Sequence, residues 1–367
     1  MMEFNYSFQP KINCKYDRER GYGFAISPEP SRFEDLRDSW PGDYFLIPVP
    51  TLLIDVPNGN YKVRLTLGDA DHPSNTTVKE GLGHLKINQL KTASGQFVQR
   101  CFAVHVSDGQ LKLAFGGLNP RVKHVEVERV SNIPTIYLAG DSTVTDQASG
   151  QFPYTGWGQM LSLFLGENIT VANHARSGRS SKSFIRESRL NRIAKRIRKN
   201  DYLLIQFAHN DEKDNGGGTR PFTTYQEYLK RYLDLARRHH AHPILIAPMH
   251  RRFFDKNGHI VNTHGDYIEG MRQLALKEKV PFVDLAMLSK VYFEELGEER
   301  SKQVFLWARP GQYENLPEGA EDNTHFSEQG AIEIAKLVAK GIHKANISPL
   351  SDYLLSKGEI DSIVSTI

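Results

Sequence analysis

The chain carries the stretch Thr135-Ile136-Tyr137-Leu138-Ala139-Gly140-Asp141-Ser142-Thr143, in which an apolar run passes directly into polar residues. The run has the length and composition of a buried strand. Ser142 would therefore lie just past the carboxyl end of that strand, where α/β proteins place their ligands. Far downstream, Asp322 and His325 supply a carboxylate and an imidazole. These three side chains are the raw material of an acyl-transfer site.

The same strand opens a region in which strand-like runs alternate with helical stretches. Such alternation predicts an α/β domain, a parallel sheet with helices on both faces, which we assign to residues 132–367. The predicted strands are 135–139, 202–207, 243–248 and 281–285, and the predicted helices are 157–165, 182–198, 224–240 and 267–279.

Residues 1–131 show a different pattern, with short strands, frequent turn residues and almost no helical periodicity. Residues 61–67 alternate apolar and polar side chains with period two, as a half-buried strand does. We therefore predict an antiparallel β-sandwich domain. Its predicted strands are 44–49, 51–56, 61–67, 84–87, 96–106, 110–115 and 124–130.

Length and composition limit the class of protein. A chain of 367 residues exceeds one typical core, so two domains are expected. No stretch approaches the roughly 20 apolar residues that span a bilayer, and we expect no membrane partner. A net charge of +3 is too small to indicate a nucleic-acid partner and is merely compatible with an acidic polysaccharide.

The first residues and the two cysteines indicate a compartment. Residues 1–6 lack the basic-then-apolar pattern of a signal peptide. We expect a cytoplasmic protein, with secretion as the alternative if a leader has been removed. A disulfide between Cys14 and Cys101 is conceivable, but reduced thiols are the expected state inside a cell.

Taken singly, each candidate site residue has a structural alternative. The Gly-x-Ser-x-Gly elbow is absent around Ser142, and a serine there also fits a loop or a helix cap. Asp322 precedes His325 by three residues in a predicted turn and can orient its imidazole, but it can equally cap a helix that begins near residue 327. Gly178 offers a backbone N–H and Asn210 an amide, as oxyanion donors or as turn residues.

In order and spacing, these pieces together resemble the conserved blocks of the SGNH (GDSL-like) hydrolase family. The similarity covers about residues 135–345 and is most specific to the rhamnogalacturonan acetylesterase branch. Its blocks correspond to Ala139-Gly140-Asp141-Ser142-Thr143-Val144, Gly156-Trp157-Gly158-Gln159, Asn173 to Ser180, Gln206 to Asp211 and Asp322 to Phe326.

The resemblance implies a flavodoxin-like sheet for the SGNH hydrolase domain at residues 132–367 and a catalytic role for each site residue. Ser142 would be the nucleophile, His325 the general base and then acid, and Asp322 the group that orients His325. The backbone N–H groups of Ser142 and Gly178 and the amide of Asn210 would form the oxyanion hole. One position departs from the family, because Ala208 stands where a glycine is usual.

Three residues beside these blocks are candidates for substrate contacts. The guanidinium of Arg179 suits a galacturonate carboxylate, with an ordinary ion pair as the alternative. His209 adjoins the Asn210 block. Trp157 fits either a sugar-stacking position or, more readily, the core.

Two other patterns are given structural interpretations. The basic residues between 186 and 199 accompany Ile185, Ile193 and Ile197 on one helical face, which favours a solvated amphipathic helix over a nucleic-acid surface. His239, His240 and His242 end a helix without a nearby acidic partner, so we predict no metal site and no cofactor.

The sequence thus predicts a serine esterase that removes acetyl groups from pectic rhamnogalacturonan or its oligosaccharides. Residues 53–69 look like a galactose-binding-like sandwich, which either binds sugar or braces the catalytic domain. Other acetyl esters such as acetylxylan, short-chain lipids or thioesters are alternative substrates. A carbohydrate-binding protein with a silent catalytic domain is the alternative from another class. The oligomeric state is not predicted.

Overall fold

The computed structural model describes residues 2–5, 15–25 and 39–363. The chain folds into two compact units. The first comprises Met1–Ile133, Ala148–Phe152 and Leu165–Thr170, and the second comprises Pro134–Gln147, Pro153–Phe164 and Val171–Ile367.

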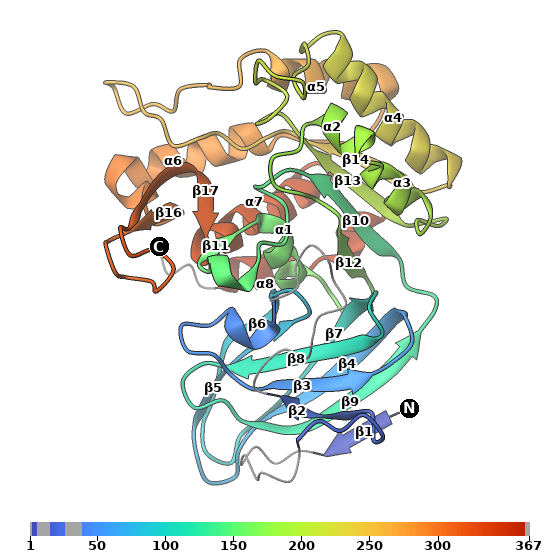
Figure 1. Ribbon diagram of the computed structural model, residues 1–367, viewed down its shortest axis with the longest axis vertical. Helices are drawn as coiled ribbons and strands as arrows, with labels where there is room; N and C mark the ends of the chain where they lie inside the picture. Colours follow the sequence, from blue (N-terminus) through green and yellow to red (C-terminus); the bar gives the residue numbers. More distant parts are fainter. Residues whose placement is uncertain (1, 6–14, 26–38, 364–367) are drawn as a thin grey trace. The chain divides into compact units, whose positions relative to one another are not determined.

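A five-stranded sheet with the order β12-β10-β13-β14-β15 forms the centre of the second unit (Figure 1). The pairs β10–β13, β13–β14 and β14–β15 are parallel. Counted within this sheet, the order is 2-1-3-4-5, which is the flavodoxin-like order. The predicted fold class is therefore confirmed. The strands are β10 (Thr135–Gly140), β12 (Thr170–Asn173), β13 (Tyr202–Gln206), β14 (His242–Ile246) and β15 (Phe282–Val283).

Helices cover both faces of this sheet, so its strands are apolar along their length. On one face Tyr137, Leu203 and Leu245 share a buried cluster with side chains of α2 to α5. On the other face α1 packs against Leu138, and α7 packs against Val283. The helices are α1 (Trp157–Met160), η4 (Leu161–Phe164), α2 (Ser181–Arg186), α3 (Arg189–Ala194), α4 (Thr224–Arg238), α5 (Tyr267–Glu278), α6 (Leu285–Ser301), α7 (Glu328–Lys344), η5 (Leu350–Tyr353) and α8 (Lys357–Ser362).

A small antiparallel sheet with the order β11-β17-β16 lies in the same unit. Its strands are β11 (Tyr154–Thr155), β16 (Phe305–Ala308) and β17 (Ala320–Ser327). Phe305 pairs with Phe326 and Trp307 with Glu321, so the four residues 322–325 of β17 oppose a single residue of β16. This bulge of four residues carries the predicted pair Asp322 and His325. Bulges re-aim side chains out of the regular strand alternation.

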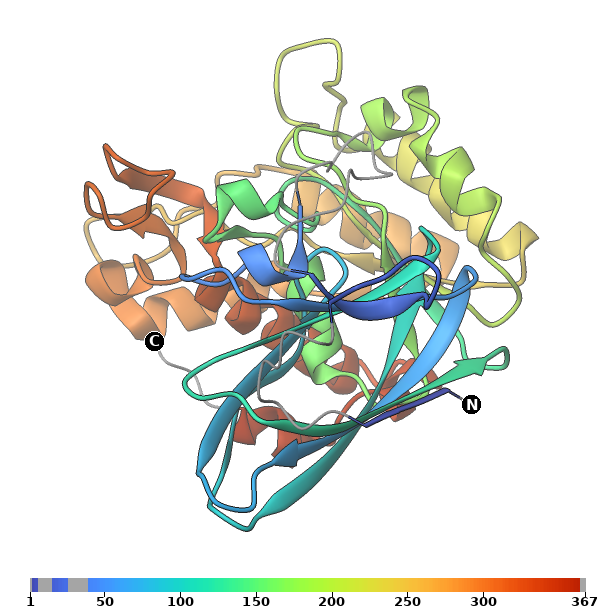
Figure 2. The same ribbon diagram turned by 60° about the horizontal axis from the view of Figure 1, so that its bottom comes forward.

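The first unit contains two antiparallel sheets with the orders β1-β9-β4-β7 and β2-β3-β8-β5-β6. Leu65 and Val104 from one sheet and Leu52 and Leu113 from the other share one buried core, as in a sandwich. Figure 2 shows these long strands most clearly. The elements of the first unit are β1 (Met2–Asn5), β2 (Tyr22–Ala25), η2 (Pro41–Asp43), β3 (Thr51–Asp55), β4 (Gly59–Gly68), β5 (Ser74–Glu80), β6 (His84–Thr92), β7 (Phe97–Val106), β8 (Gln110–Gly116), β9 (Val122–Val130) and η3 (Ser149–Gln151).

Several predicted elements were wrong in detail. Residues 44–49 form no strand but follow the 3-10 turn η2, since Pro48 and Pro50 cannot donate ladder hydrogen bonds. The predicted helix 182–198 is two short helices, because Ser188 between them has a φ of +58°. The predicted helix 157–165 tightens into a 3-10 turn after Met160. Strand β5 was missed because Ser74, Asn75, Thr76 and Thr77 give it a polar start.

Two further observations bear on the sequence predictions. Within the described residues, no helix is both long and apolar enough to cross a bilayer. Cys101 carries a free thiol, and burial raises its pKa to about 12. Cys14 lies outside the described residues.

Candidate active site

Ser142 lies in a tight turn at the carboxyl end of β10. The backbone N–H groups of Val144 and Thr145 donate to the carbonyl of Asp141 at 3.2 and 3.0 Å and close this turn. Gly140 is required here, because a Cβ at this position would lie only 2.6 Å from the Cγ2 of Val144. The Ser142 residue is 7% exposed. The nucleophile candidate is thus fixed by backbone contacts.

Asp322 and His325 lie in the bulge of β17. The Oδ1 of Asp322 accepts hydrogen bonds from the backbone N–H of Thr324 at 2.6 Å and of His325 at 2.9 Å. The helix α7 is capped instead by Ser327, whose Oγ accepts from the N–H of Gly330 at 3.1 Å. Asp322 therefore shapes the bulge, and the helix-cap alternative does not apply to it.

The three candidate residues form one line of hydrogen bonds. The Oγ of Ser142 lies 2.9 Å from the Nε2 of His325. The Nδ1 of His325 lies 2.7 Å from the Oδ2 of Asp322. Burial opposes ionisation of Asp322, but the hydrogen bond and charge of His325 and the two backbone donors hold its pKa below the usual value. An ionised carboxylate in this place holds a proton on Nδ1 and leaves Nε2 free to accept one from the serine.

Tyr154 of β11 covers this line from one side. Its ring meets the imidazole of His325 edge to face, with 4.9 Å between the ring centroids. Its hydroxyl interacts with the side chains of Ser142 and Ser177, and burial raises the pKa of this hydroxyl, so it remains protonated at neutral pH. Tyr154 thus restricts both the imidazole and the serine.

The loop that carries Gly178 is joined to the serine turn by several hydrogen bonds. The N–H of Arg176 donates to the carbonyl of Gly140 at 3.0 Å. The amide of Gln147 donates to the carbonyl of Ser142 at 2.7 Å, and the hydroxyl of Ser177 donates to the Oε1 of Gln147 at 3.3 Å. Gly178 has a φ of +78°, a conformation that favours glycine.

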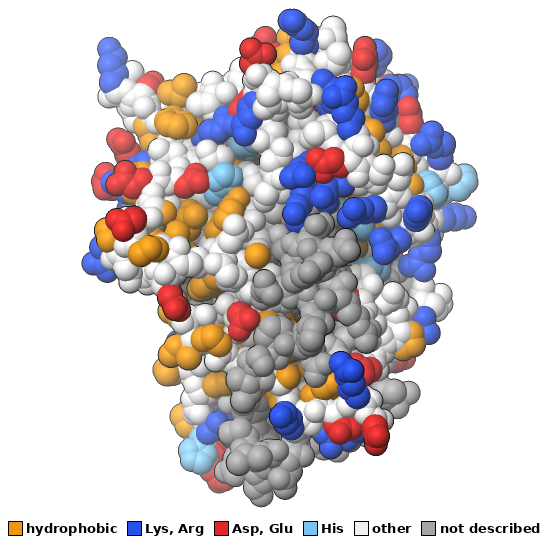
Figure 3. Space-filling model, in the orientation of Figure 1, with side chains coloured by type: hydrophobic (Ala, Val, Ile, Leu, Met, Phe, Trp, Pro, Cys, Tyr) orange, Lys and Arg blue, Asp and Glu red, His pale blue; other side chains and the backbone are white. Residues whose placement is uncertain are grey.

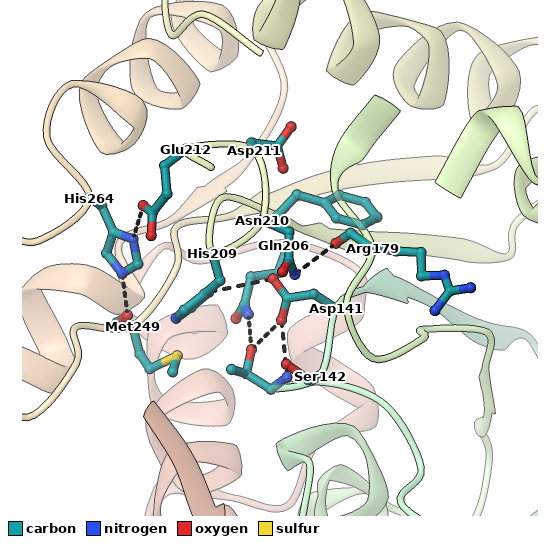
Figure 4. A network of polar contacts seen from close by, with 12 residues as sticks. Asp141, Ser142, Arg179, Gln206, His209, Asn210, Asp211, Glu212, Met249 and His264 are labelled. Carbon is teal, nitrogen blue, oxygen red and sulfur yellow. Dashed lines mark hydrogen bonds and ion pairs between the residues drawn. The ribbon is translucent and has the colours of Figure 1, made fainter. Parts of the chain in front are cut away.

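The candidate oxyanion donors are available for a ligand. Within the described part of the chain, the backbone N–H groups of Ser142 and Gly178 have no protein acceptor. The amide of Asn210 follows β13 and is 6% exposed. One of its N–H groups donates to the carbonyl of Arg179 at 3.2 Å (Figure 4), which leaves the second free. The geometry therefore brings the candidate nucleophile, the candidate base and the three candidate donors to one end of the sheet.

A network of buried hydrogen bonds supports the turn that carries Ser142. The indole N–H of Trp157 donates to the Oε1 of Gln206 at 3.0 Å, and the amide of Gln206 donates to the Oγ1 of Thr143 at 2.7 Å. Thr143 in turn donates to the Oδ1 of Asp141 at 2.9 Å from its hydroxyl and at 3.0 Å from its N–H. Each donor in this network faces an acceptor, so the hydrogen bonds are all made with only one orientation of the Gln206 amide and the Thr143 hydroxyl.

This hydrogen-bond network continues to two buried histidines, His209 and His264 (Figure 4). The Nδ1 of His209 lies 3.4 Å from the Oδ2 of Asp141. Burial alone would raise the pKa of Asp141, but His209 and the donors of Thr143 hold it below the usual value. Burial lowers the pKa of His209 to about 4 although Asp141 opposes the shift, so the imidazole is neutral at pH 7.

His264 forms the far end of this group. Its ring meets that of His209 edge to face at 4.6 Å. Its Nε2 lies 2.9 Å from the carbonyl of Met249 and its Nδ1 lies 2.9 Å from the carboxylate of Glu212, which is also paired with Arg251. Both ring nitrogens thus face acceptors. His264 fixes the orientation of His209 from a position that no substrate can reach, since it is 1% exposed.

A family model described as the GDSL-like Lipase/Acylhydrolase family matches residues 138–331. The chain belongs to this family. The match spans β10 through the start of α7 and includes Ser142, Gly178, Asn210, Asp322 and His325. The chain is therefore an ester hydrolase of the SGNH type, with the resemblance seen in the sequence confirmed at this level.

Two similar proteins come from Bacillus subtilis. The chain is 47% identical over 222 residues to "Rhamnogalacturonan acetylesterase RhgT" of Bacillus subtilis, covering 60% of this chain and 94% of that protein. It is 27% identical over 358 residues to "Uncharacterized esterase YxiM" of the same organism, covering 92% of this chain and 87% of that protein. The crystal structure of YxiM matches with a TM-score of 0.54 at 24% identity and covers 94% of this chain and 99% of that one, which supports the fold.

Within this family site, two of the three predicted substrate contacts are corrected by burial. Trp157 is 1% exposed and donates to Gln206, so no face of its indole is open to a sugar. His209 is 3% exposed and packed between Asp141 and His264. Arg179 is accessible, but its Nε donates to Glu187 at 2.9 Å and its Nη1 donates to the carbonyl of Ser177 at 2.8 Å. A role for Arg179 in substrate contact stays a prediction.

The structure adds four residues that sequence reasoning did not assign to the hydrolase site. Asp141 adjoins Ser142 in the sequence, and its complete burial was the signal that the sequence could not show. Gln147 and Lys213 lie in loops and Tyr154 lies in the two-residue strand β11, where nothing in the local pattern distinguishes them. Lys213 donates to the Oδ1 of Asn210 at 2.7 Å.

The remaining sequence candidates lie away from the site. The basic side chains of Arg186, Arg192 and Lys195 are exposed, whereas Ile193 and Ile197 are buried, which is the pattern of a solvated face despite the break at Ser188. Figure 3 shows Lys and Arg side chains gathered over this part of the second unit. Among the residues that the structure describes, no group of three or more His, Cys, Asp or Glu side chains has a metal-binding arrangement.

Proposed function

We propose that the chain is a serine acetylesterase that removes acetyl groups from rhamnogalacturonan or its oligosaccharides. The observation that carries the mechanism is the line of hydrogen bonds from Ser142 through His325 to Asp322, at 2.9 and 2.7 Å. The substrate class is supported by the similarity to RhgT, which spans nearly all of that relative.

In the first half-reaction, the Oγ of Ser142 attacks the acetyl carbonyl while the Nε2 of His325 takes its proton. Asp322 stays ionised and stabilises the imidazolium through Nδ1–H. The N–H groups of Ser142 and Gly178 and the amide of Asn210 hold the negative oxygen of the tetrahedral intermediate. The intermediate collapses, and the sugar oxygen leaves with the proton from His325.

In the second half-reaction, water attacks the acetyl group on Ser142. His325 takes a proton from the water and returns it to the serine oxygen, so that acetate leaves and the free enzyme is restored. Each donor that holds the first intermediate also holds the second. The three donors are therefore required in both steps.

The test is acetate released from acetylated rhamnogalacturonan and from acetylated xylan, by the wild-type chain and by Ser142→Ala. We expect release from rhamnogalacturonan that falls to background in the variant, because no other group can form the acyl-enzyme. Serine-dependent release from xylan alone would keep the mechanism and discard the substrate. Release that persists in Ser142→Ala would contradict the mechanism.

The same proposal includes the first unit and the location of the protein. A galactose-binding-like role for residues 1–131, a domain boundary at 131/132 and a cytoplasmic location stay predictions. Binding of acetylated and deacetylated oligosaccharides to Ser142→Ala, measured by calorimetry, tests the first of these. Two binding sites per chain would support a sugar-binding sandwich, and one would favour a bracing role.

A further inference from the structure

The side chain of Asn210 is held from both ends. Its Nδ2 donates to the backbone carbonyl of Arg179 at 3.2 Å, and its Oδ1 accepts from the Nζ of Lys213 at 2.7 Å. A carbonyl can only accept and an ammonium can only donate. Both contacts therefore demand the same orientation of the amide, with the nitrogen directed toward the Arg179 side and the oxygen toward Lys213.

The loop that supplies Lys213 is itself anchored to the second unit. The N–H of Thr219 donates to the carbonyl of Asp211 at 2.8 Å, so the loop closes on the residue after Asn210. The carboxylate of Asp211 is buried and accepts from the N–H and hydroxyl of Ser181 at the start of α2. The Nζ of Lys182 reaches the carbonyl of Gly218 at 3.3 Å. Lys213 is thus exposed but starts from a fixed backbone.

We propose that Lys213 is a positioning residue of the oxyanion hole, acting through the amide of Asn210. This inference rests on the proposed function, in which the second N–H of that amide meets the oxyanion. The contact of an ammonium with Oδ1 is charge-assisted and stronger than a neutral hydrogen bond. It draws electron density toward the oxygen and makes the amide N–H groups better donors. It also prevents the amide from turning its oxygen toward the developing negative charge, where it would repel it.

A different role for Lys213 would be direct contact with a carboxylate on the substrate, since its side chain is exposed. The two roles differ in what they require. Direct contact matters only for acidic substrates, whereas positioning of Asn210 matters for every ester that the enzyme hydrolyses. A neutral substrate therefore separates them.

The experiment is a double-mutant cycle on the hydrolysis of p-nitrophenyl acetate by the full chain. Lys213→Met should lower kcat/KM about tenfold, and Asn210→Ala should lower it about 100-fold or more. In the Asn210→Ala background, Lys213→Met should have no further effect, because the group through which it acts is gone. Lys213→Arg should restore part of the activity, since the guanidinium also donates only. Lys256→Met, at an exposed turn residue, is the matched control and should leave the rate unchanged.

The outcomes separate this inference from the proposed function. If Ser142→Ala still hydrolyses the ester, the proposed function fails. If Ser142→Ala is inactive but Lys213→Met retains the wild-type rate, only the role of Lys213 fails. A tenfold loss that persists in the Asn210→Ala background would also overturn the inference, because Lys213 would then act independently of Asn210. A loss expressed only in KM would overturn it as well, because an oxyanion donor acts in the transition state.

Discussion

The two flanks of Ser142 are built in different ways. The base flank consists of Asp322 and His325, which lie within four consecutive residues and are fixed by the bulge of β17. The oxyanion flank combines Ser142, Gly178 and Asn210 from three separate loops. Its residues are held by hydrogen bonds that Gln147 and Lys213 donate and by one that Asn210 donates to the backbone carbonyl of Arg179. A group built from neighbouring residues tolerates changes elsewhere in the chain. A group assembled from separate loops depends on every contact that holds those loops.

The largest effect should come from the base flank. In Asp322→Asn, the two backbone N–H donors of Thr324 and His325 require an oxygen at the Oδ1 position, so the new NH2 must face the Nδ1 of His325. That forces the proton onto Nε2, which can no longer accept one from Ser142. We expect kcat to fall on the order of 10^3–10^4-fold with little change in melting temperature. A loss of less than tenfold would mean that Asp322 does not set the tautomer.

A second prediction concerns the buried support of the serine turn. Gln206→Leu removes the hydrogen bonds to Trp157 and Thr143, so the buried indole N–H of Trp157 loses its acceptor, whereas the hydroxyl of Thr143 keeps its bond to Asp141. An unsatisfied buried group costs about 1–3 kcal/mol, so the free energy of unfolding should fall by about that amount in denaturant titrations. Gln273→Leu, at an exposed position of α5, is the control and should change stability by less than about 0.5 kcal/mol. Equal effects in the two variants would contradict the support role.

The smallest effect is a pH dependence of stability that arises from a histidine behind the site. Burial lowers the pKa of His250 to about 4, with the charges of His264 and Lys290 acting in the same direction and Asp284 opposing them. In the unfolded chain a histidine takes up its proton near pH 6.5. Between about pH 6.5 and 4 the unfolded state therefore binds the extra proton, and stability falls as the pH falls.

At pH 5 this linkage should cost about 2 kcal/mol relative to pH 7.5 for one such histidine. His250→Gln should remove that part of the pH dependence, and the difference can be measured by denaturant unfolding at the two pH values. Gln273→Leu, at an exposed position of α5, changes no titratable group and is the control, in which the pH dependence should stay as in the wild type. An unchanged slope in His250→Gln would show that His250 is protonated in the native state.

The sequence was sufficient for the sheet because its strands are encoded locally. The run from Thr135 to Ala139 could be interpreted from the residues themselves, whereas the Asp322-to-His325 block left a helix cap as an alternative and took its role from the family resemblance. The bulge that carries Asp322 and His325 was not predicted, since it depends on the register between β16 and β17. Neither strand shows a regular alternation of apolar and polar residues. Register is a property of pairing, which a single strand does not reveal.

The oxyanion flank could be predicted only in part. Gly178 and Asn210 were identified by resemblance, but Lys213, which contacts Asn210, and Gln147, which contacts Ser177, lie in loops whose course no short pattern specifies. His209 was named as a candidate for substrate contact although it is buried, and for Trp157 the core alternative applies. Burial depends on what packs against a residue, and both the Gln206 amide that meets Trp157 and the His264 ring that meets His209 come from elsewhere in the chain.

The central claim is that Ser142 forms the covalent intermediate. The most direct measurement is peptide mass spectrometry after inactivation of the full chain with a fluorophosphonate ester, which reacts with activated serines. We predict complete loss of esterase activity with the label on the peptide that contains Ser142, and no label on that peptide in Ser142→Ala. Inactivation with the label on another residue, or undiminished esterase activity without any label, would contradict the account.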